Sequence, residues 1–318
     1  MTDVPRGYYQ VSAQTNSLTA IQKLVRYVIA PPASLIYWQL AHKSDMPGLS
    51  DHMSVVRMGI ELLAHRSGLS LKQIYLMLFA PLVSTRYFEF NFAMQSPGFS
   101  SATKCLDVSS PRFLPMLMMR QMNSLHMDLV NPDAADLEET HQLIDALRLN
   151  THCQLHAHTL EETKFSSNSF DLITSISVVE HIPMIKPAIQ KMWGLLKPGG
   201  RLILTVPCAA KAEAQYLSTN QFNVLTTDKT GYTFFQLIFD EQQLHENIYA
   251  VAGQPTRVAI YGEKQPGFLQ RQLHQRWNAG HTYPFWREPY MMSREFRFYD
   301  HVSALPGEGV IGLEFVKP

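Results

Sequence analysis

The sequence predicts an α/β protein built on a mostly parallel sheet, and two observations support this. After residue 100, short apolar runs alternate with segments of helical periodicity. The 46% hydrophobic and 17% charged fractions provide enough apolar surface for a core, which excludes intrinsic disorder. Because strands that alternate with helices are usually joined by right-handed crossovers, the strands should lie parallel in one sheet.

Residues 1–100 are expected to form a helical N-terminal cap that also serves as a lid for a substrate. The apolar residues between Ile21 and Val28 recur at intervals of three and four, which is typical of a helix. The pair Pro31-Pro32 should end this helix, because proline lacks the backbone donor that a helix interior needs.

Two more helices are expected in this region. The first should begin with Ser50 or Asp51 as its N-cap and end at Gly68. The next should begin with Ser70 as its N-cap and close at Pro81. An aromatic run at 87–92 follows, and it predicts either core packing or a hydrophobic lid over a ligand.

Residues 101–210 carry the alternating pattern of the predicted core. Strands are expected at 104–108, 124–129, 153–158, 170–175 and 201–206, and helices at 114–122, 134–149 and 186–196. Residues 211–318 should complete the sheet with a helix at 241–252 and strands at 257–261 and 310–316. An aromatic-rich insertion, 266–301, separates the last two strands and is long enough to indicate a functional role.

Charge and cysteine content exclude several classes of function. The 27 basic and 27 acidic residues are spread along the chain without a basic segment, so a nucleic-acid partner is not expected. Three cysteines do not form a disulfide framework. The N-terminus lacks the pattern of a secretory signal and the apolar runs are too short to span a bilayer. We expect a cytoplasmic protein with no membrane partner.

Two segments carry a family resemblance. Residues 170–182 read FDLITSISVVEHI, and residues 195–207 read LLKPGGRLILTVP. Together they resemble strand four, the following helix and strand five of class I S-adenosylmethionine-dependent methyltransferases. The similarity covers about residues 103–208. It implies a Rossmann-like fold with a central seven-stranded, mostly parallel sheet between helices, and S-adenosyl-L-methionine as the cofactor.

The first motif of the family departs from its usual sequence. Asp107 matches the acidic residue that closes the first strand of the family. The glycines expected after it are replaced by Ser109, Pro111 and Phe113. The hydroxyl groups of Ser109 and Ser110 would replace backbone donors to the cofactor, and Arg112 would bind its carboxylate. The alternative is a degenerate loop that binds nothing.

The remaining cofactor residues follow from the same resemblance. Asp128, 21 residues after Asp107, would accept hydrogen bonds from the ribose hydroxyls, the alternative being a helix-cap or loop acid. Thr159 and Leu160 occupy the positions that the family places beside the adenine. The cofactor should also be lined by the residues at the end of strand four: Ser175, Ile176 and Ser177.

His181 is the candidate general base, because it follows the crevice-facing end of strand four and titrates near neutral pH. A packing role is the alternative, and the late insertion offers other groups that would meet a substrate hydroxyl: His281, Tyr283, Tyr299 and His301. The substrate is expected to contact Tyr283, Trp286, Tyr299 and His301. The insertion would otherwise be a locally packed subdomain or a dimer contact. Cys153, His156 and His158 have no second ligand cluster, so no metal site is predicted.

The sequence thus predicts a methyltransferase that acts by in-line displacement on a small, largely apolar or aromatic molecule, at oxygen, nitrogen or carbon, in a role such as secondary metabolism. A homodimer is possible. Two alternatives remain open: a different S-adenosylmethionine-dependent reaction on the same fold, and a non-catalytic binding or scaffolding protein. A nicotinamide-dependent reductase is disfavoured because no G-x-G-x-x-G follows a strand.

Overall fold

A computed structural model describes residues 4–11, 19–44, 46–65, 67–122, 124–219, 225, 227–279 and 283–318. Eight strands form the large sheet, in the order β10-β9-β11-β6-β5-β2-β3-β4. Their bounds are β2 (Lys104–Val108), β3 (His126–Val130), β4 (Cys153–His156), β5 (Phe170–Ile176), β6 (Leu196–Cys208), β9 (Arg257–Glu263), β10 (Phe296–Tyr299) and β11 (Gly309–Val316). The prediction of a mostly parallel sheet is confirmed, with one strand more than expected.

Parallel pairing connects β6, β5, β2, β3 and β4. β11 lies antiparallel between β6 and β9, and β10 pairs antiparallel with β9 at the edge. The additional strand, β10, lies inside the 266–301 insertion. This insertion also contains α11 (Phe268–Ala279) and α12 (Glu288–Glu295), so it is an ordered part of the fold and not a long loop.

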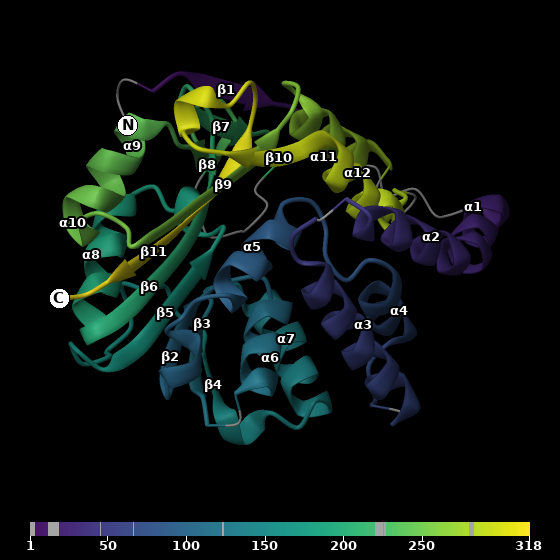
Figure 1. The fold of residues 1–318 in the computed structure, drawn as a ribbon, viewed down its shortest axis with the longest axis horizontal. Helices are drawn as coiled ribbons and strands as arrows, with labels where there is room; N and C mark the ends of the chain where they lie inside the picture. Colours follow the sequence, from purple (N-terminus) through teal and green to yellow (C-terminus); the bar gives the residue numbers. More distant parts are fainter. Residues whose placement is uncertain are drawn as a thin grey trace.

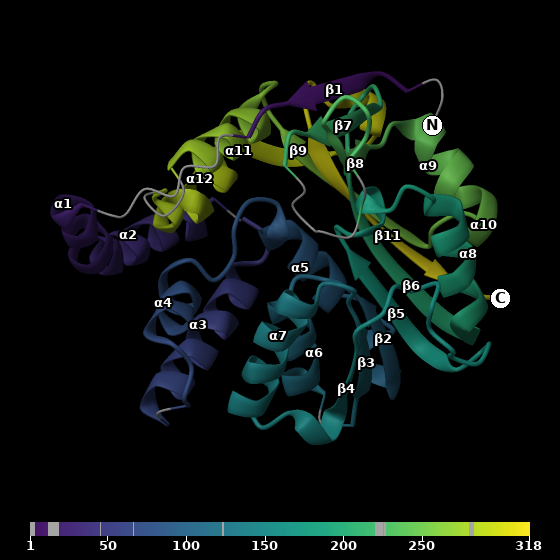
Figure 2. The same ribbon diagram turned by 180° about the vertical axis from the view of Figure 1, so that it is seen from behind.

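Helices cover both faces of the sheet (Figures 1 and 2). On one face lie α5 (Arg86–Met94), α6 (Phe113–Gln121) and α7 (Ala134–Ala146). On the other lie α8 (Ile185–Leu195), α9 (Glu241–Leu244) and α10 (Ala250–Ala252). The buried apolar residues form two separate clusters, one on each side of the sheet. This is the layered architecture that lets an α/β sheet bury both of its faces.

The N-terminal region is helical, but two of its predicted boundaries are wrong. Pro31-Pro32 does not end the first helix. α1 (Ala20–Leu24) passes through a π-helical segment, Val25–Ile29, into α2 (Ala30–His42), and the prolines stand in the first turn of α2, where missing donors are tolerated. The next helix, α3 (Leu49–Ala64), begins after Gly48, whose φ is +76°, and not after Ser50 or Asp51.

The third predicted helix is confirmed. α4 (Leu71–Phe79) begins at Ser70, which forms a capping box with Gln73. The aromatic run is helix α5, and its rings Tyr87, Phe88, Phe90 and Phe92 are buried, as core packing predicts.

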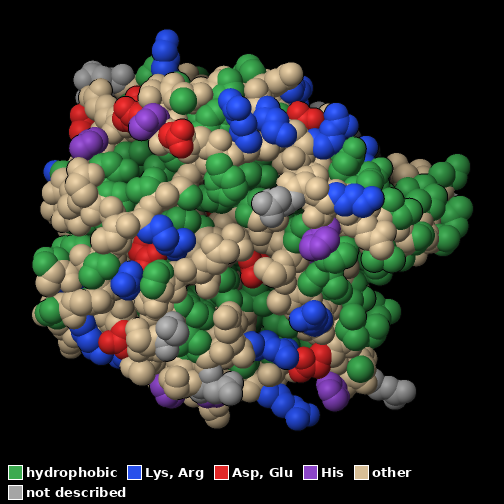
Figure 3. Space-filling model, in the orientation of Figure 1, with side chains coloured by type: hydrophobic (Ala, Val, Ile, Leu, Met, Phe, Trp, Pro, Cys, Tyr) green, Lys and Arg blue, Asp and Glu red, His purple; other side chains and the backbone are tan. Residues whose placement is uncertain are grey.

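The outer helices α1 and α2 project from the body of the protein (Figures 1 and 3). With the segment between them they expose large apolar side chains: Ile21, Leu24, Tyr27, Val28, Ile29, Leu35, Ile36 and Leu40. Among the described residues, no helix has the length and apolar character needed to cross a membrane.

A small sheet that the sequence did not indicate consists of β1 (Arg6–Tyr9), β7 (Glu213–Leu217) and β8 (Thr233–Ile238), in the order β1-β7-β8. β1 runs parallel to β7, which is more than 200 residues away in the chain. The small sheet lies next to α11 near the end of the large sheet where β6 terminates (Figures 1 and 2).

A buried ionic network fixes α5 against the sheet. The Glu314 carboxylate of β11 accepts hydrogen bonds at 2.7 Å from Arg201, Arg257 and Ser96, which follows α5. Burial alone would raise the pKa of Glu314, but these three donors hold it below its ordinary value. Arg257 also donates to the carbonyl oxygen of Phe92 at 2.7 Å, so the network reaches into α5 itself.

The turn after β2 takes the left-handed conformation that the family usually builds with glycine. The φ angle of Ser109 is +51°. Its backbone N–H and its hydroxyl both donate to the carbonyl oxygen of Val130, at 2.9 Å each. The replacement of glycine by serine therefore keeps the shape of the turn and adds a bond to β3.

We predict that Ser109→Ala is less stable than Ser109→Gly by about 1 kcal/mol. Both variants lose the hydroxyl bond to Val130, but only alanine retains a Cβ atom in the left-handed region. Urea denaturation of the two variants beside the wild type measures the difference. Equal stability of the two variants would show that this turn carries no backbone strain.

Close packing of α5 on β11 gives a second prediction. A Cβ atom at Gly312 would lie 2.6 Å from the ring of Phe92, a core residue of α5. Gly312→Ala should therefore reduce the free energy of unfolding by about 1–3 kcal/mol. Gly194→Ala in α8, where no atom lies within 4 Å, is the matched control and should raise stability by up to about 1 kcal/mol. Comparable effects of the two changes would contradict the close packing of α5 on β11.

Candidate functional site

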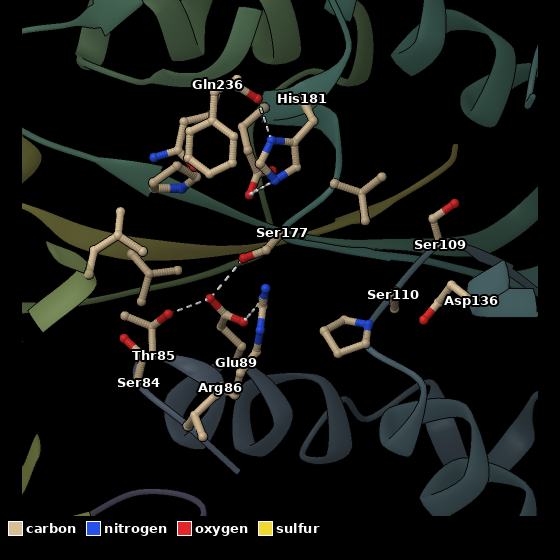
Figure 4. Close-up of a pocket in the computed structure, with 18 of the residues that line it drawn as sticks. Ser84, Thr85, Arg86, Glu89, Ser109, Ser110, Asp136, Ser177, His181 and Gln236 are labelled. Carbon is tan, nitrogen blue, oxygen red and sulfur yellow. Dashed lines mark hydrogen bonds and ion pairs between the residues drawn. The ribbon is translucent and has the colours of Figure 1, made fainter. Parts of the chain in front are cut away.

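A cavity of about 1180 Å³ opens at the carboxyl ends of β2, β3 and β5. Parallel strands place their carboxyl ends at one edge of the sheet, and this edge is where ligands bind in open α/β folds. The walls come from segments far apart in the chain, including α4, the loop before α5, β8 and α11. Figure 4 shows the polar side chains that point into the cavity from these elements.

The turn after β2 is braced on both sides by hydrogen bonds. Asp107 is fully buried and accepts from the Ser110 backbone N–H at 3.1 Å and from Thr174 at 2.6 Å. The Ser110 hydroxyl in turn accepts from the backbone N–H of Ile176 at 3.0 Å. Burial raises the pKa of Asp107 to about 6, against the effect of these donors. Asp107 thus shapes the turn and does not line the cavity, whereas Ser109 and Ser110 do.

Asp128 does not occupy the place predicted for it. It stands in the middle of β3 opposite Leu106, and β3 continues for two residues beyond it. Its carboxylate contacts His156 Nε2 at 2.7 Å, with Lys104 Nζ 4.0 Å away. Asp128 is not among the residues that line the cavity. The spacing from Asp107 indicated an acid near the strand end, but the strand ends later than the sequence suggested.

Asn131 follows the end of β3 and lines the cavity in place of Asp128. Its amide donates to Asp136 Oδ2 at 2.8 Å, and its Oδ1 accepts from the backbone N–H of Asp133 at 2.9 Å. Arg112, from the turn after β2, forms ion pairs with Asp136 and Glu139 of α7. The turn and the start of α7 are therefore held together by charge at this edge of the cavity.

The residues predicted near the adenine do reach the cavity. Thr159 and Leu160 both line it, and the backbone N–H and hydroxyl of Thr159 donate to Glu162 at 2.9 and 3.0 Å. Of the three residues predicted at the end of β5, Ser177 lines the cavity, while Ser175 and Ile176 are fully buried and do not. Ser177 has a φ of +50°, a second left-handed serine at a strand end.

Helix α5 contributes charged groups that the sequence did not single out. Glu89 is 1% exposed and lines the cavity. Its carboxylate accepts from Ser177 at 2.8 Å and from Thr85 at 2.9 Å, and it forms an ion pair with Arg86 (Figure 4). The signal available in the sequence was a charged pair, three residues apart, inside an aromatic run.

His181 lines the cavity as predicted, in the 3-10 turn Val179–His181 that follows β5. Its Nδ1–H donates to the carbonyl oxygen of Phe235 in β8 at 2.5 Å, and burial lowers its pKa to about 4. The imidazole is therefore neutral at pH 7. The neighbouring Glu180 is 2% exposed, and burial raises its pKa to about 8.

The residues predicted to contact the substrate do not line the main cavity. Tyr283 and Trp286 line a separate cavity of about 110 Å³ beside α1 and α4. The Tyr299 hydroxyl donates to the carbonyl oxygen of Glu263 at 2.6 Å, and His301 is exposed beyond the end of β10. His281 lies outside the described residues. The insertion folds into helices and an edge strand, and of its described aromatic residues Phe285 lines the main cavity while Phe298 is exposed.

The described part of the chain contains no group of three His, Cys, Asp or Glu side chains arranged for a metal ion. His156, one of the residues considered for such a site, is bound to Asp128. The three cysteines Cys105, Cys153 and Cys208 are not in disulfides.

Comparison with solved structures finds proteins of similar architecture at low identity. The geranyl diphosphate C-methyltransferase of Streptomyces coelicolor A3(2) has 11% identity and a TM-score of 0.47, over 73% of this chain and 80% of that one. A putative sarcosine dimethylglycine methyltransferase from Galdieria sulphuraria has 12% identity and a TM-score of 0.47, over 78% and 88%. The [4+2]-cyclase SpnF has 14% identity and a TM-score of 0.44, over 75% and 84%. We draw no conclusion about activity from likenesses at this level.

No curated protein matches the sequence. A family model described as a methyltransferase domain matches residues 112–204, which run from α6 through most of β6. The matched range includes both segments that carried the resemblance, except for the last residues of the second. This match shows that residues 112–204 are similar to a methyltransferase domain, and they contribute parallel strands of the large sheet.

Proposed function

We propose that the protein transfers a methyl group from S-adenosyl-L-methionine to a small, largely apolar or aromatic molecule bound in the main cavity. The observation that carries this proposal is the position of the cavity, which begins at the carboxyl ends of β2, β3 and β5 and extends toward α11 and the small sheet. Its volume of about 1180 Å³ exceeds what one drug-sized ligand usually occupies, so a cofactor and an acceptor can be held together.

The polar groups at the sheet edge fit an adenosyl amino acid. Arg86 and Arg112 supply cations for a carboxylate, although both already contact acidic side chains. Asn131 and Asp136 place oxygens at the end of β3, where ribose hydroxyls need acceptors. Leu160 offers an apolar contact for the adenine. When bound, the cofactor would supply an electrophilic methyl group on a sulfonium.

The chain's own contribution is positioning and exclusion of water. Apolar side chains from α4, the loop before α5, α11 and the 3-10 turn Phe285–Arg287 line the cavity, among them Leu76, Leu82, Leu269, Leu273 and Phe285. Such a lining favours an acceptor with a large apolar portion. Methyl transfer by in-line displacement depends chiefly on holding the two reactants in line, so this enclosure is the main requirement on the protein.

The left-handed turn at Ser109 supports this proposal over the non-catalytic alternative. A loop that had lost its binding role would have no need to keep a strained backbone conformation with a serine. The turn does not favour a different reaction of S-adenosyl-L-methionine over methyl transfer. We therefore propose methyl transfer as the function. Calorimetric titration with S-adenosyl-L-methionine tests it, and folded protein that fails to bind would overturn it.

For the ribose contact, we predict that Asp136→Asn weakens the binding of S-adenosyl-L-methionine by roughly tenfold, about 1.4 kcal/mol, because hydrogen bonds to a charged acceptor are stronger than those to an amide. Asp128→Asn is the matched control, since Asp128 is near the same strand end but does not line the cavity. The affinity of the Asp128→Asn variant for S-adenosyl-L-methionine should stay within about twofold of that of the wild type. The reverse pattern would restore Asp128 as the ribose ligand.

A further inference from the structure

The carboxyl group of Glu180 lies at the cavity wall with one oxygen unpaired. Glu180 is 2% exposed and lines the cavity from the turn after β5. Its Oε2 atom is buried and has no hydrogen-bond partner within the described part of the chain. Buried polar atoms almost always have partners, so an unpartnered carboxyl oxygen on a residue that lines the cavity is a candidate contact for a ligand group.

Glu89, the second buried acid of the cavity, is in the opposite situation. Both of its carboxylate oxygens accept hydrogen bonds, from Thr85 and Ser177 on one side and from Arg86 on the other. Of the two acids, only Glu180 retains an unpaired oxygen for a ligand.

The protonation of Glu180 is set by its surroundings. Burial is the main cause of its raised pKa, and the negative charge of Glu89 adds to it. The positive charge of Arg86 acts in the opposite direction. His181 Nε2 lies 3.9 Å from Glu180 Oε1, but the imidazole is neutral near pH 7 and contributes no charge there. Glu180 therefore exchanges its proton close to neutral pH, as an acid–base group requires.

We infer that Glu180, and not His181, takes the proton from the methyl acceptor, and that the acceptor presents a hydroxyl or amine group to Glu180 Oε2. This inference rests on the proposed methyltransferase function and adds the class of nucleophile to it. A hydroxyl group can both donate and accept, so it satisfies Oε2 in either protonation state of the carboxyl group.

The proposed methyl transfer involves the acceptor, the sulfonium and the Glu180 carboxylate. The oxygen or nitrogen of the acceptor forms a bond to the methyl carbon, while the carbon–sulfur bond of the sulfonium breaks and its electron pair stays on sulfur. The proton of the acceptor passes to the Glu180 carboxylate and later leaves to water. Glu89 and Arg86 act as positioning residues, because they set the charge around Glu180 without receiving the proton.

The direction of the pH dependence follows from this role. Only ionised Glu180 can accept a proton, so the rate should rise with pH through the pKa of about 8 and level off above it. Glu89→Gln removes a negative charge and should move this rise to lower pH. Arg86→Gln removes a positive charge and should move it to higher pH. A purely structural role for these two residues would not produce shifts of opposite sign.

Infrared titration of the full chain without ligand tests the protonation directly. We expect a protonated-carboxyl band that disappears near pH 8, is absent in Glu180→Gln, and shifts to lower pH in Glu89→Gln. Glu308→Gln is the matched control, because burial raises the pKa of Glu308 to about 7 and this variant should remove a separate band only. Titration of Glu180 near its ordinary value of 4.5 would overturn the inference.

Binding of a matched pair of probes tests the contact with the acceptor. Above pH 8, where most of Glu180 is ionised, a 4-alkylphenol should bind the wild type roughly tenfold more tightly than the alkylbenzene of equal chain length, about the effect of one hydrogen bond to a charged group. Glu180→Gln, checked for folding by thermal denaturation, should abolish this preference and leave the affinity for S-adenosyl-L-methionine unchanged. A preference that persists in Glu180→Gln, or a wild type that does not bind the phenol, would overturn the inference. Absence of cofactor binding would instead overturn the proposed function, and the infrared titration would still report on Glu180.

Discussion

The buried carboxylate of Glu314 is the interaction on which the arrangement of the site depends. It lies in the antiparallel strand β11 and receives Arg201 from β6, Arg257 from β9 and Ser96 from the end of α5. Removal of one partner of a buried ionic network leaves an uncompensated charge, which typically costs about 3–5 kcal/mol. The network thus joins three strands and holds α5 over the sheet. Because Arg86 and Glu89 are carried by α5, their place in the cavity follows from this anchor.

Much of the fold could be predicted from the sequence because its signals are local. Most residues of β2 and β5 are apolar, and Ser70 and Gln73 form the capping box that begins α4. The small sheet could not be predicted in the same way. β1 pairs with β7, which is more than 200 residues away in the sequence. The two strands have only four and five residues, and such short segments show too little periodicity to indicate that they pair. The prediction that Pro31-Pro32 ends a helix was wrong because the effect of a proline depends on its position. A proline breaks the interior of a helix but is tolerated in its first turn.

The sequence predicts those site residues that directly follow a strand. It does not predict those that the packing of a helix brings to the cavity. Ser109, Thr159 and His181 reach the cavity because each follows a strand of the sheet, and the family motif locates those strand ends. Asp128 was misplaced because β3 ends at Val130, one residue later than expected, so Asn131 and not Asp128 follows the strand at the sheet edge. Glu89 and Arg86 were missed because their aromatic neighbours indicated only a core helix. The charged pair of that helix becomes meaningful once Glu89 and Arg86 are seen beside Ser177, which follows β5 (Figure 4).

Ser109 and Ser177 are two of the left-handed serines that line the cavity, and the family resemblance predicts glycine at the first of these positions. Ser109 and Ser177 both adopt a conformation that costs a non-glycine residue about 1–2 kcal/mol, and both stand directly after or close to the end of a parallel strand. In each case the hydroxyl group forms a bond that a glycine cannot form, to Val130 in one and to Glu89 in the other. The bond from Ser177 to Glu89 keeps that acid saturated with donors. A glycine at 177 would leave an oxygen of Glu89 with one donor fewer and would make the two cavity acids more alike. The hydroxyl group of Ser177 is therefore part of what makes Glu89 and Glu180 chemically different.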